Sequence, residues 1–142
     1  MTASHHELQQ WESLELLGST HVGRVCVLEG EYPIAVPVNY CISGQDGASV
    51  IFRTAPNSLL ARVEGPASLE VDEIDLSGGT AWSVIARGRL RRVFGQHTLP
   101  DPLPIVSVDR RQWMQLTITA VSGRKFTIHA AADGFSVEWQ VA

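Results

Sequence analysis

Strict alternation of apolar and polar residues is the feature that most constrains the fold of this chain. The alternation is plainest from Gln112 to Val121, where Met114, Leu116 and Ile118 are separated by polar side chains. Successive side chains of a strand point to opposite faces of a sheet, so a period of two is typical of a strand with one buried face. The sequence therefore predicts a mainly β protein.

Seven or eight such strands are predicted. Besides 112–121, they cover residues 22–28, 34–42, 48–53, 67–72, 82–91, 125–130 and 135–141. Ser122-Gly123 is expected to turn the chain between two of them, and Pro37 is expected to lie at an unpaired edge because proline has no backbone N–H. Long alternating strands joined by tight turns favour an antiparallel barrel or sandwich.

Two helices are predicted among these strands. Residues 7–17 have helical spacing of apolar side chains, with Ser4 as the expected N-cap and Glu7 three residues later, as in a capping box. A short second helix is expected over residues 58–63. No repeat or linker interrupts the 142 residues, which predicts one domain over 1–142.

Composition narrows the possible partners and locations. Hydrophobic residues make up 44% and the net charge is −4, which is typical of a globular protein and argues against nucleic-acid or anionic-membrane partners. The chain has no apolar run of about 18 residues and its first ten residues are polar, so we expect a cytoplasmic protein. Cys26 and Cys41 lack metal-site spacing and are expected to be buried thiols, with no metal bound.

The stretch from Phe52 to Ser58 is a candidate anion site. A hydrophobic strand ends in Arg53 and Thr54, and Ser58 follows at the expected helix start. A guanidinium binds phosphate with a planar fork, and hydroxyls and free backbone N–H groups add to it. The alternative interpretation is an arginine paired with an acid, with Thr54 or Ser58 capping the helix.

Two further strands carry candidate site residues. Asn39 follows Pro37 by two residues in the same predicted strand, so the backbone of an unpaired edge is available there to a planar heterocycle. The alternative interpretation, an ordinary exposed residue of an edge strand, explains Asn39 equally well. Trp82 fits a core position or a ligand contact, and Ser83 lies on the opposite face.

Charged side chains form two groups that we expect to pair across the sheet. One group is acidic and spans 70–75, and the other contains Arg87, Arg89, Arg91 and Arg92. This pairing is favoured over a metal or nucleic-acid site. The five histidines lie in no nucleophile motif, so no catalytic residue is assigned.

Five segments, taken in order, resemble the pyridoxamine 5′-phosphate oxidase-like family of flavin-binding split barrels. The resemblance covers roughly residues 8–93. The segments are Leu17-Gly18 with Val22-Gly23-Arg24-Val25, Pro33 with Pro37-Val38-Asn39-Tyr40, Ile51-Phe52-Arg53-Thr54-Ala55, residues 69–75, and Trp82-Ser83-Val84 with Gly88-Arg89.

The resemblance implies an antiparallel six-stranded split β-barrel, with an N-terminal and a short internal helix, that forms a homodimer with FMN at the subunit interface. The residues implied along the flavin ring are Val38, Asn39 and Tyr40. Those implied around the ribityl chain and phosphate are Phe52, Arg53, Thr54 and Ser58. Trp82 and Ser83 are implied to come from the partner subunit. Leu59 stands where many members of the family have a lysine that pairs with the phosphate.

The expected function is that of an FMN-binding flavoprotein, an oxidoreductase acting on a small molecule. In such enzymes the cofactor supplies the hydride chemistry, so no acid–base residue need be visible in the sequence. Two alternatives stay open. One is a barrel that binds F420 or haem, with His21, His97 or His129 as the axial ligand. The other is a cofactor-free dimeric binding or regulatory module, so the sequence does not decide whether the protein is an enzyme.

Overall fold

The structure is a computed structural model that describes residues 6–44, 48–103, 109–131 and 134–137. Its strands are β1 His6–Glu7, β2 Val22–Glu29, β3 Tyr32–Ser43, β4 Ser49–Thr54, β5 Gly65–Asp75, β6 Thr80–Val93, β7 Gln112–Ala131 and β8 Gly134–Val137. Its helices are α1 Gln10–Gly18 and α2 Leu59–Arg62. The expected mainly β architecture with two helices is confirmed.

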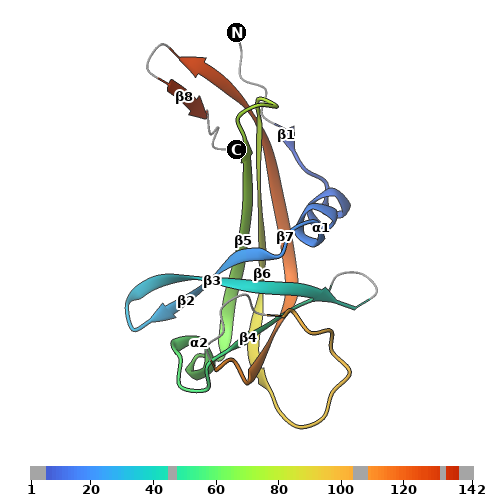
Figure 1. The fold of residues 1–142 in the computed structure, drawn as a ribbon, viewed down its shortest axis with the longest axis vertical. Helices are drawn as coiled ribbons and strands as arrows, with labels where there is room; N and C mark the ends of the chain where they lie inside the picture. Colours follow the sequence, from blue (N-terminus) through green and yellow to red (C-terminus); the bar gives the residue numbers. More distant parts are fainter. Residues whose placement is uncertain (1–5, 45–47, 104–108, 132–133, 138–142) are drawn as a thin grey trace.

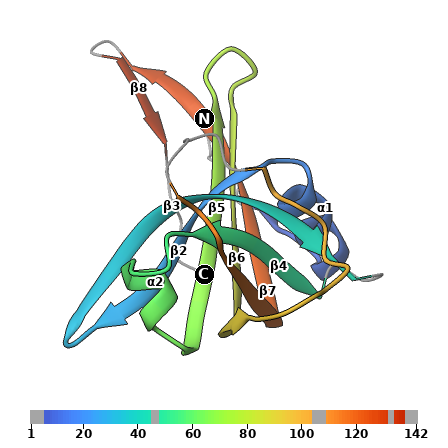
Figure 2. The same ribbon diagram turned by 60° about the horizontal axis from the view of Figure 1, so that its bottom comes forward.

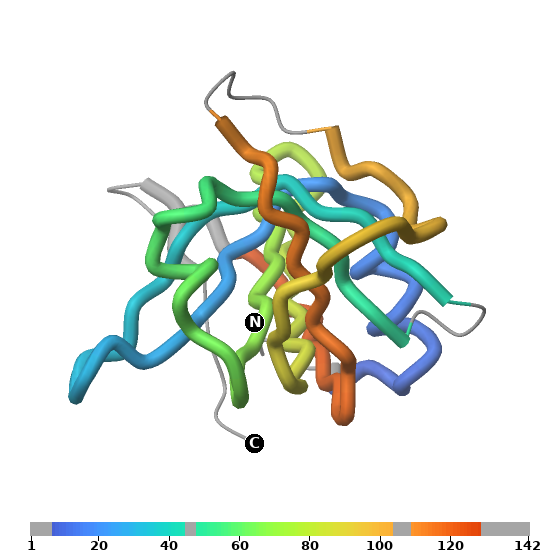
Figure 3. The backbone as a smooth tube through the Cα atoms, turned by 90° about the horizontal axis from the view of Figure 1, so that it is seen from below, coloured from blue at the N-terminus to red at the C-terminus, as the bar shows by residue number. Residues whose placement is uncertain are grey.

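Six antiparallel strands close into a ring. Their order is β7-β4-β3-β2-β5-β6, and β6 pairs with β7 again (Figures 1 and 3). The short strands β1 and β8 pair with β7 outside this ring. The predicted six-stranded split barrel is therefore confirmed. No helix in the described ranges is long and apolar enough to cross a membrane.

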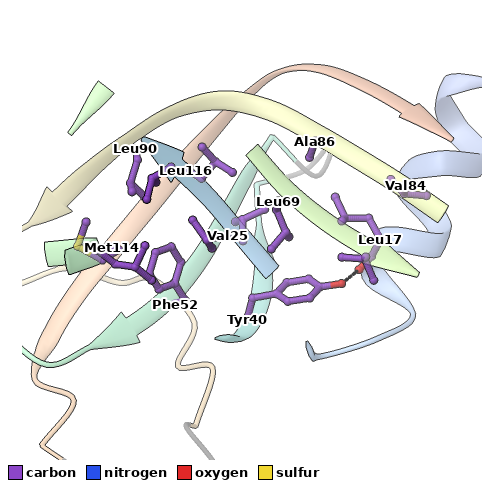
Figure 4. Packing of buried hydrophobic residues seen from close by; sticks show 14 residues of the cluster. Leu17, Val25, Tyr40, Phe52, Leu69, Val84, Ala86, Leu90, Met114 and Leu116 are labelled. Carbon is purple, nitrogen blue, oxygen red and sulfur yellow. Dashed lines mark hydrogen bonds between the residues drawn. The ribbon is translucent and has the colours of Figure 1, made fainter. Parts of the chain in front are cut away.

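The core fills the inside of the ring. Val25, Phe52, Leu69 and Met114 are each fully buried there, and they come from four different strands (Figure 4). α1 lies beside β7 (Figures 1 and 2) and contributes the fully buried Leu17. The burial of Leu17 fixes α1 to the part of the barrel that the helix covers.

The predicted turn at Ser122-Gly123 is wrong, because β7 runs unbroken through it. Gly123 pairs with Val84 of β6 and is buried beneath α1. A Cβ atom at Gly123 would lie 2.6 Å from Ser13 Oγ and 2.9 Å from Leu8 Cδ1. The glycine therefore gives the helix room to approach the strand and does not reverse the chain.

The predicted start of the first helix is also wrong. Glu7 belongs to β1, and the helix begins at Gln10 with Gln9 as its N-cap. Gln9 and Glu12 form the capping box that the sequence analysis assigned to Ser4 and Glu7. Ser4 lies outside the described residues, as does the end of the strand predicted over 135–141.

Gly88 lies where the backbone of β7 approaches β6 too closely for a side chain. The register shifts between Arg87 and Gly88, and the β7 residue Thr119 is the extra residue of a β-bulge. A Cβ atom at Gly88 would lie 1.8 Å from the Thr117 backbone oxygen, which is far inside van der Waals contact. The bulge in the longest strand pair therefore requires glycine at this position.

We expect Gly88→Ala to lower the free energy of unfolding by at least about 2 kcal/mol, because the β6 and β7 backbones must separate to admit the methyl group. Urea unfolding followed by circular dichroism measures the change. Gly18→Ala is the matched control, because a Cβ atom there has no neighbour within 4 Å. Equal and small losses in the two variants would contradict the close approach.

Candidate functional site

The first part of the site is an open backbone edge on β3. Residues 32–39 pair with β2 on one side, whereas pairing with β4 begins only at Tyr40. The Tyr40 N–H donates to the His21 carbonyl on the β2 side, so the backbone of Asn39 faces the opposite, open side. By the same alternation Pro33 and Pro37 face that side, where proline has no N–H to leave unpaired. The structure therefore places Asn39 on an edge that no described strand covers.

Tyr40 and Phe52 are placed differently from the other predicted contacts. Their side chains are 1% and 0% exposed and belong to the core. The Tyr40 hydroxyl donates to the Leu17 carbonyl and lies 2.9 Å from Thr20 Oγ1, while burial raises the pKa of this phenol. Val38 is half-buried and also packs toward the core. Neither the Tyr40 nor the Phe52 side chain is thus available to a ligand on the outer face.

Arg53 lies on the outer face with an anion already against it. Its Nη1 donates to Asp101 Oδ1 at 3.1 Å, and its Nε donates to the Arg110 carbonyl at 2.9 Å. The guanidinium carbon lies 5.4 Å from the centre of the Trp113 ring. The Leu103 backbone N–H, and next the Arg53 guanidinium, hold the pKa of Asp101 below its usual value, so this carboxylate is charged at neutral pH.

The segment 94–103 brings Asp101 to this position. It crosses the outer side of β3 and β4 (Figure 2), and the Cys41 thiol donates to the Pro100 carbonyl at 3.5 Å. Pro102 is buried, and Ile51 of β4 is fully buried although its side chain lies on the same face as Arg53. This segment therefore covers one end of the candidate site and neutralises its cation.

Thr54 and Ser58 meet each other and not Arg53. Their hydroxyl oxygens are 2.7 Å apart, and Ser58 Oγ accepts from the Ala61 N–H at 3.3 Å as the N-cap of α2. Thr54 is 2% exposed and lies on the opposite face of β4 from Arg53, because neighbouring residues of a strand alternate. Leu59 is half-buried and packs against the core. The contacts of the two hydroxyls match the capping interpretation of the sequence.

Trp82 and Ser83 lie near the opposite end of β6. Trp82 pairs with Glu73 and Lys125, whereas Val93 at the far end of the strand pairs with Trp113, the neighbour of Arg53. Eleven residues of strand separate Trp82 from Val93, which is about 35 Å at the usual rise. Both residues are half-buried. Within one chain, therefore, Trp82 and Arg53 do not share a small ligand.

The predicted pairing of the acidic stretch with the β6 arginines is wrong. Arg24 of β2 forms ion pairs with two of the acidic side chains instead. Its Nε lies 2.7 Å from Glu70 Oε2, and its Nη2 lies 2.8 Å from Asp72 Oδ2. Arg92 bonds Glu64 at 2.8 Å. In the register, Arg24 lies directly across from Glu70, closer than the arginines farther along β6. Burial raises the pKa of Glu70, with Arg24 acting in the opposite direction.

Sequence reasoning missed Asp101, Arg110 and Trp113. Asp101 contacts Arg53 across 48 residues of sequence, and nothing local in its proline-rich segment indicates that contact. Trp113 lies opposite Arg53 because β4 pairs with β7, which the sequence did not predict. Cys26 and Cys41 are free thiols, and both are half-buried. Within the described ranges no cluster of three metal-ligating side chains occurs.

Several solved structures share this fold. The FAD binding protein from Mycobacterium smegmatis is 26% identical, with a TM-score of 0.67 over 87% of this chain and 99% of that one. A FAD-binding protein from Mesorhizobium loti is 20% identical, with the same TM-score over 89% and 99% of the two chains. The FAD and heme binding protein from Mycobacterium smegmatis is 13% identical, with a TM-score of 0.61 over 93% and 83%.

No curated protein matches the chain. A family model does match it over residues 9–125, and its description is pyridoxamine 5′-phosphate oxidase. The matched range includes both helices, strands β2 to β6, and β7 as far as Lys125. Every residue of the candidate site lies within it. The chain therefore belongs to the pyridoxamine 5′-phosphate oxidase family.

Proposed function

We propose that the protein is a homodimer that binds FMN and acts as an oxidoreductase on a small molecule. The observation that carries the proposal is the Arg53 guanidinium, which lies on the outer face near the open β3 edge and holds an anionic partner there. Membership of the family supports it. So does the binding of FAD by proteins of the same fold, because FAD contains the ring, ribityl chain and first phosphate of FMN.

Arg53 suits the phosphate end of a flavin. Its planar fork of N–H donors matches phosphate oxygens, and the Trp113 ring fixes one side of the guanidinium. Asp101 now accepts the hydrogen bond from Arg53 Nη1. Binding of FMN would therefore replace a carboxylate, which carries one negative charge, with a phosphate that carries a larger negative charge. Thr54 and Ser58 contribute by holding the strand end and α2 in place.

The β3 edge suits the ring of the flavin. A planar ring needs flat apolar neighbours and a few hydrogen bonds in its plane. On the open side of β3, Ala35 and Asn39 offer backbone N–H donors. Pro33 and Pro37 offer apolar surfaces there and have no backbone N–H. A bound flavin supplies hydride and electron transfer, and the residues of this chain orient it against the strand.

Trp82 and Ser83 reach this flavin only from a second copy of the chain, because about 35 Å of strand separates them from the Arg53 end. Ile74 and Leu76 lie beyond them, where the β5–β6 hairpin extends past the ring (Figure 1), and each is 51% exposed. A second chain would cover these apolar side chains. The proposed site therefore combines Arg53 and the β3 edge of one subunit with Trp82 and Ser83 of the other.

A cofactor-free dimeric binding module is the second candidate. It is favoured by one observation: the charge of Arg53 is already balanced by Asp101, and Leu59 adds no second cation. In this candidate the Arg53–Asp101 pair closes the segment 94–103 onto the barrel. The two candidates differ in how the pair responds to a phosphate-bearing flavin.

Arg53→Ala and Asp101→Asn are expected to change FMN affinity in opposite directions. Loss of the guanidinium removes a charged hydrogen bond and weakens FMN binding by about 10- to 100-fold. Asp101→Asn keeps an oxygen for the Leu103 N–H but removes the competing charge, so FMN binds severalfold more tightly. Titration followed by flavin fluorescence measures both affinities.

Riboflavin, which lacks the phosphate, is the matched ligand and should bind equally to both variants and to the wild-type chain. Arg62→Ala and Glu15→Gln are the matched variants, because both residues are exposed on helices and neither contacts Arg53 or Asp101. If Arg53→Ala and Asp101→Asn left FMN affinity at the wild-type value, phosphate recognition by Arg53 would be ruled out. If no variant bound flavin saturably, the cofactor-free candidate would stand.

Mixed dimers test the shared site. The Arg53→Ala and Trp82→Ala chains are each expected to bind FMN weakly, but a dimer made of one of each has one site with both residues intact. Co-refolding the two chains should therefore restore FMN binding that neither shows alone. The control mixes Arg53→Ala with the Arg53→Ala, Trp82→Ala double variant, which has no intact site in any dimer. Recovery no greater than in this control would contradict a site built from two subunits.

A further inference from the structure

Arg87 and Arg89 of β6 have no acidic partner among the residues that the structure describes. Both side chains are exposed. Glu70 and Asp72 are bound by Arg24, Glu64 is bound by Arg92, and Asp75 caps the following turn by accepting from the Gly78 N–H. Two positive charges therefore lie side by side on one face of the barrel without compensation.

A cavity of about 600 Å3 lies beside these arginines. In the pairing register, Cys26 of β2, Ser68 of β5 and Arg87 of β6 form one row across three strands. Apolar residues complete the cavity wall, among them Leu28, Pro33, Pro66 and Ala67. None of the described residues that line it has a carboxylate. We call this cavity the β2–β5–β6 groove.

The β-bulge shapes the groove. Gly88 has no side chain and lies in the lining between the two arginines, while Thr119, the extra residue of β7, lines the same cavity. The Thr119 hydroxyl donates to the Arg87 carbonyl at 3.2 Å, which fixes the bulge where the guanidinium side chain begins. Bulges bend a strand locally and redirect its side chains, which is the effect required to open a hollow on a sheet.

We propose that the β2–β5–β6 groove binds a small amphiphilic anion, an apolar body bearing one carboxylate or phosphate. The two guanidinium groups match an oxyanion, and the hydroxyls of Ser68 and Thr119 add donors of the kind that bind such groups. The proline and leucine side chains match the apolar body. The volume lies within the range of ordinary small-molecule sites.

Within one chain, the arginines of the groove are separate from Arg53 of the proposed flavin site. Arg53 lies on β4, and β3 and β2 intervene between β4 and β5 in the ring. Pro33, at the start of the open β3 edge, borders both sites, whereas Asn39, Arg53, Trp82 and Ser83 do not line the groove. The proposal therefore does not depend on flavin binding, and either one can fail alone.

Cys26 provides a reporter inside the groove. Its thiol is free and half-buried, and Cys41, the other free thiol, lies outside the groove beside Pro100. Alkylation of both cysteines by the neutral reagent N-ethylmaleimide is followed by peptide mass spectrometry. The probes are 4-phenylbutyrate, phenyl phosphate and the uncharged 4-phenylbutyramide.

The groove predicts that both anionic probes slow alkylation of Cys26 saturably, while Cys41 reacts at an unchanged rate and the amide has little effect. Arg87→Gln with Arg89→Gln should raise the protecting concentration about tenfold or more, as expected for lost charged hydrogen bonds. Arg62→Gln, an exposed arginine of α2, is the matched control and should leave protection unchanged. Comparing the two anions shows whether carboxylate or phosphate is preferred.

Four results would overturn the proposal. Equal slowing of both cysteines, or slowing by the amide as strong as by the acid, would show that charge recognition at the groove is absent. A Cys26 that does not react in the free protein would show that another chain or segment covers the groove. Protection of Cys26 by FMN that is lost in Arg53→Ala would assign the groove to the flavin site.

Discussion

The ring closes because one strand, β7, pairs along both of its edges. Its first residues, from Gln112 to Thr117, lie between β4 on one side and the end of β6 on the other. This double pairing encloses the core and sets Trp113 beside Arg53. The bulge at Thr119 and the bare backbone of Gly88 allow so long a strand to follow both neighbours. Both candidate sites lie on strands that this closure fixes.

Charge is distributed unevenly over the outside of the ring. Arg24 is bound by two carboxylates, Arg53 by one, and Arg87 and Arg89 by none among the described residues. The same residue type thus has different roles. A cation held between two acids ties strands together, a cation with one exchangeable partner suits a competing phosphate, and free cations beside a cavity suit an anionic ligand. The position of each acid, more than the number of arginines, decides these roles.

Short patterns in the sequence correctly predicted the features that depend on residues close together in the chain. Alternation predicted the strands around Met114 and Leu116, and Pro37 was rightly placed on an edge with no described partner. The capping interpretation of Thr54 and Ser58 agrees with their contacts because those contacts span only a few residues. Such features need no knowledge of which strands meet.

Contacts between distant segments were not predictable in this way. Gly123 looks like a turn residue in the sequence, and only the packing of α1 explains it as a close approach. The partner of Arg53 came from a proline-rich segment 48 residues away, and the partner of Glu70 and Asp72 from β2 instead of β6. In each case the contact depends on how segments far apart in the sequence pack together, which short patterns do not reveal.

The flavin site that we propose for this chain consists of Arg53 and the open β3 edge. The most direct measurement is the absorption spectrum of the purified wild-type protein, with mass spectrometry of any bound molecule and titration of the emptied protein with FMN. We expect a flavin spectrum, or saturable binding of one FMN per chain with a Kd of roughly micromolar order or below. A colourless protein that shows no saturable FMN binding in that range would contradict it.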